Sequence, residues 1–164
     1  MSVRRMFGPG MRTYFIPLAA GLTLAASAFL PWVVVGGVSL RGVPGMAALW
    51  VLGLGALSAV LATLSLITRK NSRHPLLVVG LAALGITYLS LQIMPRLAGE
   101  NALTVAQAFA IVENRPLDSA PTARAGAGIY VGLGASAVLV AFGLTIVIKR
   151  ASQPYVNSDP NDDV

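Results

Sequence analysis

The chain has 164 residues, of which 55% are hydrophobic and only 11% are charged, and its net charge is +6. Soluble domains carry roughly 25% charged residues, so this chain lacks the polar surface of a water-facing globule and is too apolar to be disordered. It contains no cysteine, which excludes disulfides, thiolate metal sites and cysteine nucleophiles.

The positions of the charges predict four membrane spans. Four stretches of 22 to 28 residues lack Asp, Glu, Lys and Arg, and a helix needs about 20 apolar residues to cross the hydrocarbon core. Prolines mark several boundaries, because proline starts or stops helices. The sequence therefore predicts an all-α integral membrane four-helix bundle, one domain over residues 1–164, with helices at about 14–35, 46–67, 76–94 and 127–148.

The first predicted helix has an alternative interpretation as a signal peptide. Three arginines precede it, and Ala26-Ser27-Ala28 resembles a signal-peptidase site. However, the apolar run continues beyond Ala28 as far as Val35. We therefore expect an uncleaved first span.

The distribution of basic residues predicts the orientation. Eight Lys and Arg residues lie in the two terminal segments and the loop between the second and third spans, whereas four lie on the other side. Under the positive-inside rule both termini are cytoplasmic, as is the polar tail 151–164. Trp32 and Trp50 then fall near the outer face, where amphipathic rings act as interfacial anchors.

The long outer loop, residues 95–125, contains a predicted amphipathic helix between the third and fourth spans. Thr104 and Gln107 have the spacing of a capping box. Apolar residues then recur with the period of one helix face, at Val105, Ala108, Phe109 and Val112. This helix could lie on the outer leaflet, cover the bundle or bind a partner.

Small residues recur every four positions on two of the spans. They are Gly55, Ala59 and Thr63 on the second, and Gly128, Gly132 and Ser136 on the fourth. Small residues at this spacing allow helix backbones to approach closely. The stripes predict either a docking face for a partner subunit or seams within the bundle itself.

Candidate catalytic and metal-binding residues are few. No Asp, Glu, Lys or Arg lies within a predicted span, which argues against a proton relay. His74 has no partner at ligand spacing, and the outer carboxylates Glu100, Glu113 and Asp118 are matched by three outer arginines. We expect no enzyme activity, cofactor or metal, and no nucleic-acid partner, because the basic residues flank the spans instead of forming one patch.

The stretch Phe29-Leu30-Pro31-Trp32 is followed by a Gly-containing turn and three further spans. This layout resembles small actinobacterial four-helix membrane proteins and is loosely similar to the claudins. The chain departs from the claudin pattern, since paired cysteines are missing and the second outer loop, not the first, is long.

Together with the high Arg and Ala content, the layout also resembles accessory subunits of mycobacterial MCE-type lipid importers. The resemblance implies a non-catalytic subunit in the bacterial plasma (inner) membrane. Its partners would be membrane lipids and other integral membrane subunits, with the importer permease preferred. An accessory role in a respiratory supercomplex is the first alternative, and a stand-alone lipid-handling or adhesion protein is the second.

Overall fold

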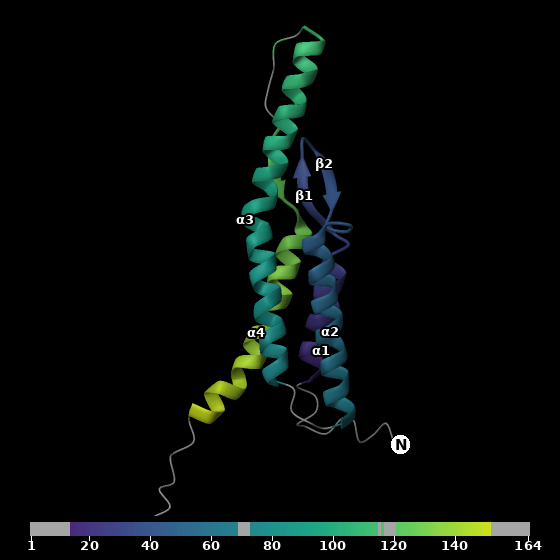
Figure 1. The fold of residues 1–164 in the computed structure, drawn as a ribbon. Helices are drawn as coiled ribbons and strands as arrows, with labels where there is room; N and C mark the ends of the chain where they lie inside the picture. The colour runs from purple at the N-terminus through teal and green to yellow at the C-terminus, as the bar shows by residue number, and fades with distance from the viewer. Residues whose placement is uncertain (1–13, 69–72, 115, 117–120, 152–164) are drawn as a thin grey trace, which may run out of the picture.

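The computed structural model describes residues 14–68, 73–114, 116 and 121–151 of the chain. In these residues four helices and three strands form one elongated arrangement (Figure 1). The helices are α1 (Phe15–Ser27), α2 (Met46–Thr68), α3 (Arg73–Val112) and α4 (Ala127–Ala151). The strands are β1 (Pro31–Val35), β2 (Val38–Arg41) and β3 (Ala123–Ala125).

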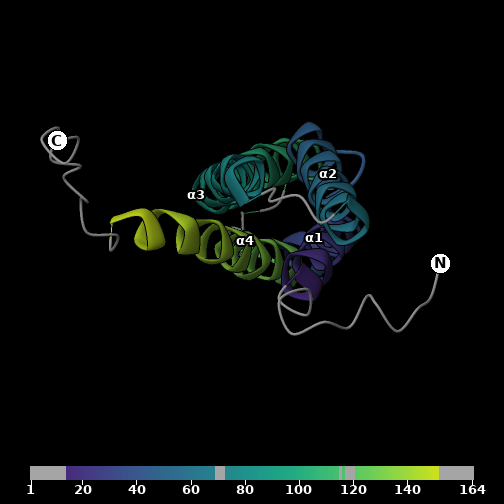
Figure 2. The same cartoon turned by 90° about the horizontal axis from the view of Figure 1, so that it is seen from below.

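The four helices form a ring in which α1 packs against α2 and α4, and α3 packs against the same two helices (Figure 2). Three of them, α2, α3 and α4, are long and apolar enough to cross a membrane. The 13-residue α1 is apolar but shorter, about 20 Å at 1.5 Å per residue. The predicted mostly helical chain with four helices is therefore confirmed, and a small sheet that was not predicted lies at one end of the bundle.

The first predicted helix, 14–35, is wrong beyond Ser27, because Pro31–Val35 forms a strand. Proline is unfavourable in a helix interior, and the three valines that follow favour the extended backbone. Gly36 and Gly37 have φ values of +55° and +88°. A two-residue hairpin turn of this kind needs positive φ at both positions, which glycine adopts without strain. The sequence from 33 to 38 therefore encodes a β-hairpin.

The sheet is antiparallel and has the strand order β2-β1-β3. Val35 pairs with Val38 across the turn and with Ala123 on the other side. β3 lies inside the stretch 95–125 that the sequence predicts as a loop, so that prediction is wrong for these residues. The hydrogen bond from the Gly126 N–H to the Trp32 carbonyl oxygen, 2.7 Å, joins the start of α4 to β1.

The third predicted helix does not stop at Pro95, because α3 continues through this residue to Val112. The separate helix predicted to begin at Thr104 is thus the second half of α3. Its capping box is also wrong, since the Thr104 hydroxyl donates to the carbonyl oxygen of Glu100 at 3.0 Å, a bond within the helix. Good helix formers and packing against the sheet offset the hydrogen bond that proline cannot make.

The second half of α3 reaches well beyond the other helices. Met94 lies level with the start of α2, because its Cε would be 4.0 Å from a Cβ placed on Gly45. Residues 95–112, here called the α3 extension, therefore rise beyond the bundle beside the sheet (Figure 1). At 1.5 Å per residue the extension is about 27 Å long.

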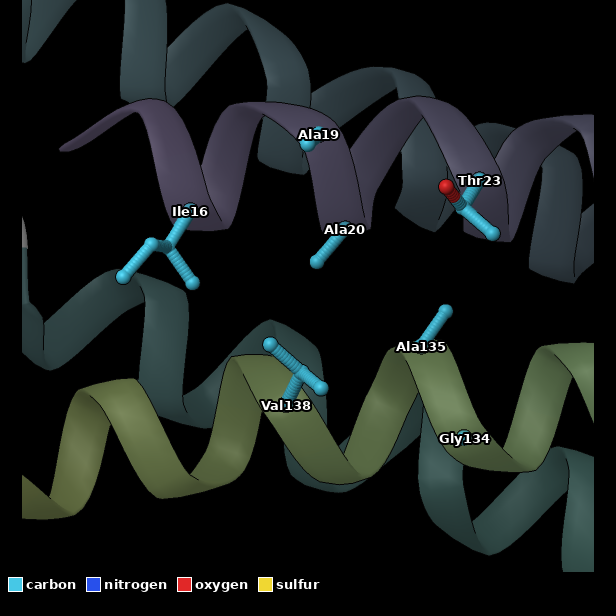
Figure 3. A pocket seen from close by; sticks show the side chains of 7 residues that line it. All are labelled: Ile16, Ala19, Ala20, Thr23, Gly134, Ala135 and Val138. Carbon is cyan, nitrogen blue, oxygen red and sulfur yellow. The ribbon is translucent and has the colours of Figure 1, made fainter. Parts of the chain in front are cut away.

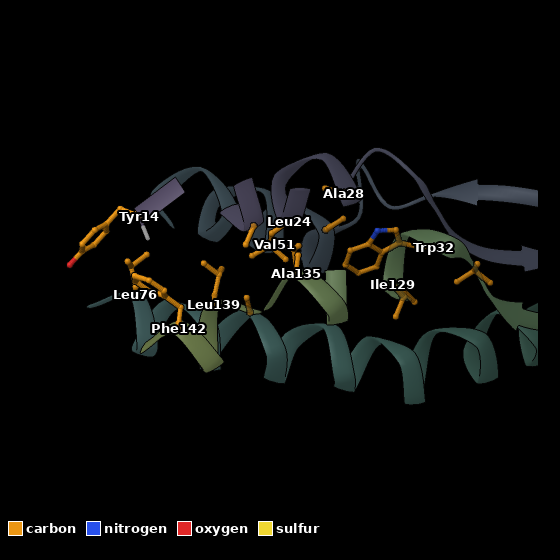
Figure 4. Close-up of a cluster of buried hydrophobic side chains, with 14 of the residues drawn as sticks. Tyr14, Leu24, Ala28, Trp32, Val51, Leu76, Ile129, Ala135, Leu139 and Phe142 are labelled. Atoms are coloured by element: carbon orange, nitrogen blue, oxygen red, sulfur yellow. The ribbon is translucent and has the colours of Figure 1, made fainter. Parts of the chain in front are cut away.

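The buried core follows the axis of the bundle (Figure 4). Leu24, Val51 and Leu139 are fully buried in its middle. At the end away from the sheet, Tyr14 and Phe142 pack edge to face with ring centroids 5.4 Å apart. Trp32 fills the end next to the sheet. One continuous core thus joins the helices to the base of the hairpin.

Candidate functional site

The small residues of α2 contact α1. A Cβ on Gly55 would lie 2.5 Å from the backbone nitrogen of Ala25 and 2.8 Å from the carbonyl oxygen of Gly21. Conversely, a Cβ on Gly21 would lie 2.8 Å from the backbone nitrogen of Ala59. Thr63, the third member of the predicted stripe, is exposed and donates to the carbonyl oxygen of Ala59 at 2.8 Å. Gly55 and Ala59 therefore form a seam with α1.

The small residues of α4 are buried within the bundle as well. A Cβ on Gly132 would lie 3.0 Å from Thr87 Cγ2 and 3.1 Å from Ser27 Oγ. The Ser136 hydroxyl is buried and donates to the carbonyl oxygen of Leu133 at 2.9 Å. Gly128 abuts Trp32. Packing within the chain accounts for five of the six predicted residues, and Thr63 is the member that stays accessible.

Sequence reasoning missed the α1 partner of the first seam and the contact between α3 and α4. Gly21 and Ala25 have the same four-residue spacing as Gly55 and Ala59, so the signal was present in α1. A Cβ on Gly143 would lie 2.6 Å from the Cβ of Leu77. A lone glycine of this kind carries no periodic signal.

The two predicted interfacial anchors have different environments. Trp50, the fifth residue of α2, is 62% exposed, and an interfacial anchor has to be exposed. Trp32 is 1% exposed, and its indole N–H donates to the Ser27 carbonyl oxygen at 2.9 Å. Gly42 and Gly128 leave room for the ring, because a Cβ on either would lie within 2.6 Å of Trp32 Cδ1. The anchor prediction is wrong for Trp32, which packs inside the molecule.

The predicted amphipathic face of the outer helix is uncovered in the part of the chain that the structure describes. We call Val105, Ala108, Phe109 and Val112 the apolar stripe; all four are exposed, with 62% exposure at Phe109 and 83% at Val112. A different side of the extension meets the sheet, where a Cβ on Gly99 would lie 3.5 Å from the Cβ of Ala123. The stripe therefore does not cover the bundle.

A shallow apolar groove of about 420 Å³ runs between α1 and α4 (Figure 3). Small side chains form much of its wall, and Thr23 supplies its one hydroxyl group. The groove is lined by Ile16, Ala19, Ala20, Thr23, Gly134, Ala135 and Val138. None of these described lining residues is charged, so the surface that they form suits hydrocarbon and not a polar substrate.

Most of the buried hydroxyl groups donate hydrogen bonds to backbone carbonyl oxygens of their own helices. Thr87 Oγ1 donates to the carbonyl oxygen of Ala83 at 2.8 Å, and Ser65 Oγ donates to that of Leu61 at 2.9 Å. Ser58 Oγ is buried and has no partner among the described residues. These hydroxyls act as small packing groups more than as a polar path between helices.

The charged and imidazole groups considered for chemistry are dispersed. His74, Glu100 and Glu113 are exposed at separate points of α3 and just after it. Asp118 lies outside the described residues, as do 152–164 of the predicted tail. Within the described ranges no three His, Cys, Asp or Glu side chains are grouped as a metal site requires.

The chain was compared with protein-family models, with curated proteins and with solved structures, and nothing matches it. Among the described residues, the apolar stripe and the groove are the two apolar surfaces that bear on function.

Proposed function

We propose that the protein is a non-catalytic accessory subunit of a larger complex in the bacterial plasma membrane, with an MCE-type lipid importer as the preferred complex. In this proposal the helices cross the membrane and both termini are cytoplasmic. The sheet and the α3 extension then project from the outer face. The protein holds partner subunits in place and performs no reaction of its own.

The observation that carries the proposal is the apolar stripe on the α3 extension. Its residues lie beyond the ends of α1, α2 and α4, outside the length that matches a bilayer. The extension continues the line of α3 and does not fold back across the end of the bundle (Figure 1). No other described part of the chain covers this apolar face. Such faces mark interaction sites.

The composition of the helices also supports a structural role. Residues 46–68, 74–95 and 127–148 contain no Asp, Glu, Lys or Arg. Carriers driven by protons or ions place ionisable groups within the membrane despite their insertion cost. Apart from Ser58, whose hydroxyl has no partner, the described buried hydroxyls bond within their own helices, so they form no polar path between helices.

The proposal is tested by mild detergent extraction of a tagged chain at its native level, followed by mass spectrometry. We expect a lipid-importer permease and its substrate-binding subunits to co-purify. Phe109→Lys should reduce their recovery at least fivefold, because it places a charge in the stripe. Gln107→Lys is the matched control, since it changes an exposed polar residue on another side of the same extension. A chain recovered alone, or with further copies only, contradicts the proposal.

The orientation has its own test. A cysteine at Asn101 should react with an impermeant maleimide in intact cells, whereas a cysteine at Thr68 should react only after the cells are opened. Both positions are exposed in the structure, so access to the side chain is not limiting. The opposite labelling pattern contradicts the proposed topology.

Two alternatives predict different outcomes of the same extraction. Haem–copper oxidase subunits in place of a permease would favour an accessory role in a respiratory supercomplex. The groove between α1 and α4 favours a stand-alone lipid-handling protein, because its lining is almost wholly apolar. In that case lipid would co-purify with the lone chain, and Gly134→Leu, which fills the groove, would reduce the amount of bound lipid.

A further inference from the structure

The outer edge of β2 is open in the described part of the chain. β1 lies between β2 and β3, so only one side of β2 is paired. All four residues of β2 are exposed, with 64% exposure at Val38 and 50% at Leu40. The opposite edge differs, because β3 contacts α3. β2 is therefore the one edge of the sheet that remains accessible.

The register shows which backbone groups point outward from this edge. The Gly36 N–H donates to Thr122 and the Trp32 carbonyl accepts from Gly126, so the even-numbered residues of β1 face β3. Val33 and Val35 therefore face β2, where their partners are Leu40 and Val38. Along a strand, the N–H and C=O groups of successive residues point alternately to one side of the strand and to the other.

Ser39 consequently directs its N–H and C=O away from the sheet. Arg41 does the same, because the next residue, Gly42, bonds back to the carbonyl oxygen of Leu30 at 3.1 Å. Two donors and two acceptors are thus presented along one line. An extended polypeptide can bind such an edge as an additional strand.

Two apolar side chains accompany these groups. Val38 and Leu40 share a sheet face with Val33, which is 6% exposed and belongs to the core. α3 covers that face near β3, where Gly99 meets Ala123, and leaves its β2 side open. Backbone groups along an edge and alternate apolar side chains beside it are together the pattern of strand addition.

A second copy of the chain does not fit this edge well. If the chain spans a membrane as proposed, two copies in one membrane are related by rotation about the membrane normal. β2 runs roughly along the bundle axis (Figure 1), so the rotation leaves both β2 strands pointing the same way. Only parallel pairing is then possible, which is slightly weaker per residue and here limited to four residues.

We infer that β2 binds an extended segment of a different protein, which adds antiparallel to β2 as a fourth strand. Because β2 runs from the turn back towards the bundle, the added segment runs away from the bundle. It carries apolar side chains at alternate positions, which contact Val38 and Leu40. The inference rests on the proposed function and specifies the chemistry of one partner contact.

The test uses the full chain in native membranes with the photoreactive residue p-benzoylphenylalanine at Val38. We expect a cross-linked adduct with another protein, and mass spectrometry should place the adduct in an extended segment. Ser39→Pro should reduce the adduct at least tenfold, because proline removes the outward N–H without removing a bond to β1. Ser39→Ala retains the N–H and should leave the adduct unchanged.

The fold of each variant is checked by the emission of buried Trp32 in a Trp50→Phe background. A shift in that emission would mean that Ser39→Pro disturbs the fold, and Leu40→Lys then serves as the test variant. Leu40→Lys keeps every backbone group and should also reduce the adduct tenfold, because it replaces an apolar contact with a charge. An adduct that persists in the deciding variant overturns the inference, and so does an adduct whose mass is that of two copies.

A second probe separates this inference from the proposed function. With p-benzoylphenylalanine at Phe109, an adduct to another protein supports the apolar stripe as a partner surface. Adducts at Phe109 but none at Val38 would overturn the role of β2 and leave the proposed function standing. Adducts at neither position would contradict both.

Discussion

The indole N–H of Trp32 donates a hydrogen bond to the carbonyl oxygen of Ser27 at 2.9 Å, and this bond ties β1 to the end of α1. The Leu30 N–H shares the same oxygen at 3.2 Å. Gly128, from α4, lies against the ring. The position of the hairpin relative to the bundle therefore depends on one side chain and the space that glycine leaves for it.

The first prediction concerns that space. Gly128→Ala would place a Cβ 2.5 Å from Trp32 Cδ1 and 2.8 Å from the Ser27 carbonyl oxygen, so we expect a loss of about 1–3 kcal/mol in stability from overpacking. Gly134→Ala is the control on the same helix, because its Cβ would have no neighbour within 4 Å. Thermal unfolding in detergent should show a lower Tm for the first variant only; equal Tm values would contradict the packing described.

A second prediction distinguishes internal packing from partner docking on α4. Gly132→Leu would push against Thr87 and Ser27, since even a Cβ would lie 3.0 Å from the former. We expect this variant to lower the Tm of the isolated chain. Partner recovery should fall only in proportion to the folded chain that remains. A normal Tm with a selective loss of partner would instead make this stripe a docking face.

The third prediction compares two buried serines of α2. Ser58 Oγ has no partner among the described residues, whereas Ser65 Oγ donates to the Leu61 carbonyl oxygen at 2.9 Å. Ser58→Ala should leave stability unchanged or raise it, because it removes a buried polar group without a bond. Ser65→Ala should cost about 0.5–1.5 kcal/mol. The comparison is made by chemical or thermal unfolding, and a greater loss for Ser58→Ala would show that its hydroxyl is bonded.

A fourth prediction concerns the continuity of α3. Leu81 and Ile111 are both exposed and lie 30 residues apart on this helix, which corresponds to about 45 Å at 1.5 Å per residue. Spin labels at these positions should give one narrow distance distribution near that value in a pulsed electron-resonance measurement. A helix that ends at Pro95 and a second helix lying across the bundle would give a shorter and broader distribution.

The sequence predicts the helices best where apolar composition acts alone. The second span, expected at 46–67, is found as Met46–Thr68, because its uncharged run contains no competing signal. The prediction of the first span, 14–35, is wrong beyond Ser27, because the length of the uncharged run does not reveal its local backbone preferences. A run can be long enough for a membrane helix and still contain Pro31, three valines and two glycines, which together specify a hairpin.

The third span fails for the opposite reason. Pro95 is a correct local signal for a helix end, but tertiary packing overrides it in α3. The two candidate partner surfaces also differ in how far the sequence predicts them. Periodicity correctly located Phe109 on an apolar face, whereas the open edge at Ser39 depends on strand pairing that no periodic pattern encodes.

The α3 extension amplifies any tilt of α3, because one half of this helix is packed in the bundle and the other half projects from it. α3 is a 40-residue helix, about 60 Å long, and the other helices hold it along roughly half of that length. A tilt of about 10° where the extension leaves the bundle would move its far end, about 27 Å away, by about 5 Å. β3 packs against the same rod, so the sheet would be displaced with it. A small change in helix packing within the bundle is thereby converted into a larger displacement at the far end of α3.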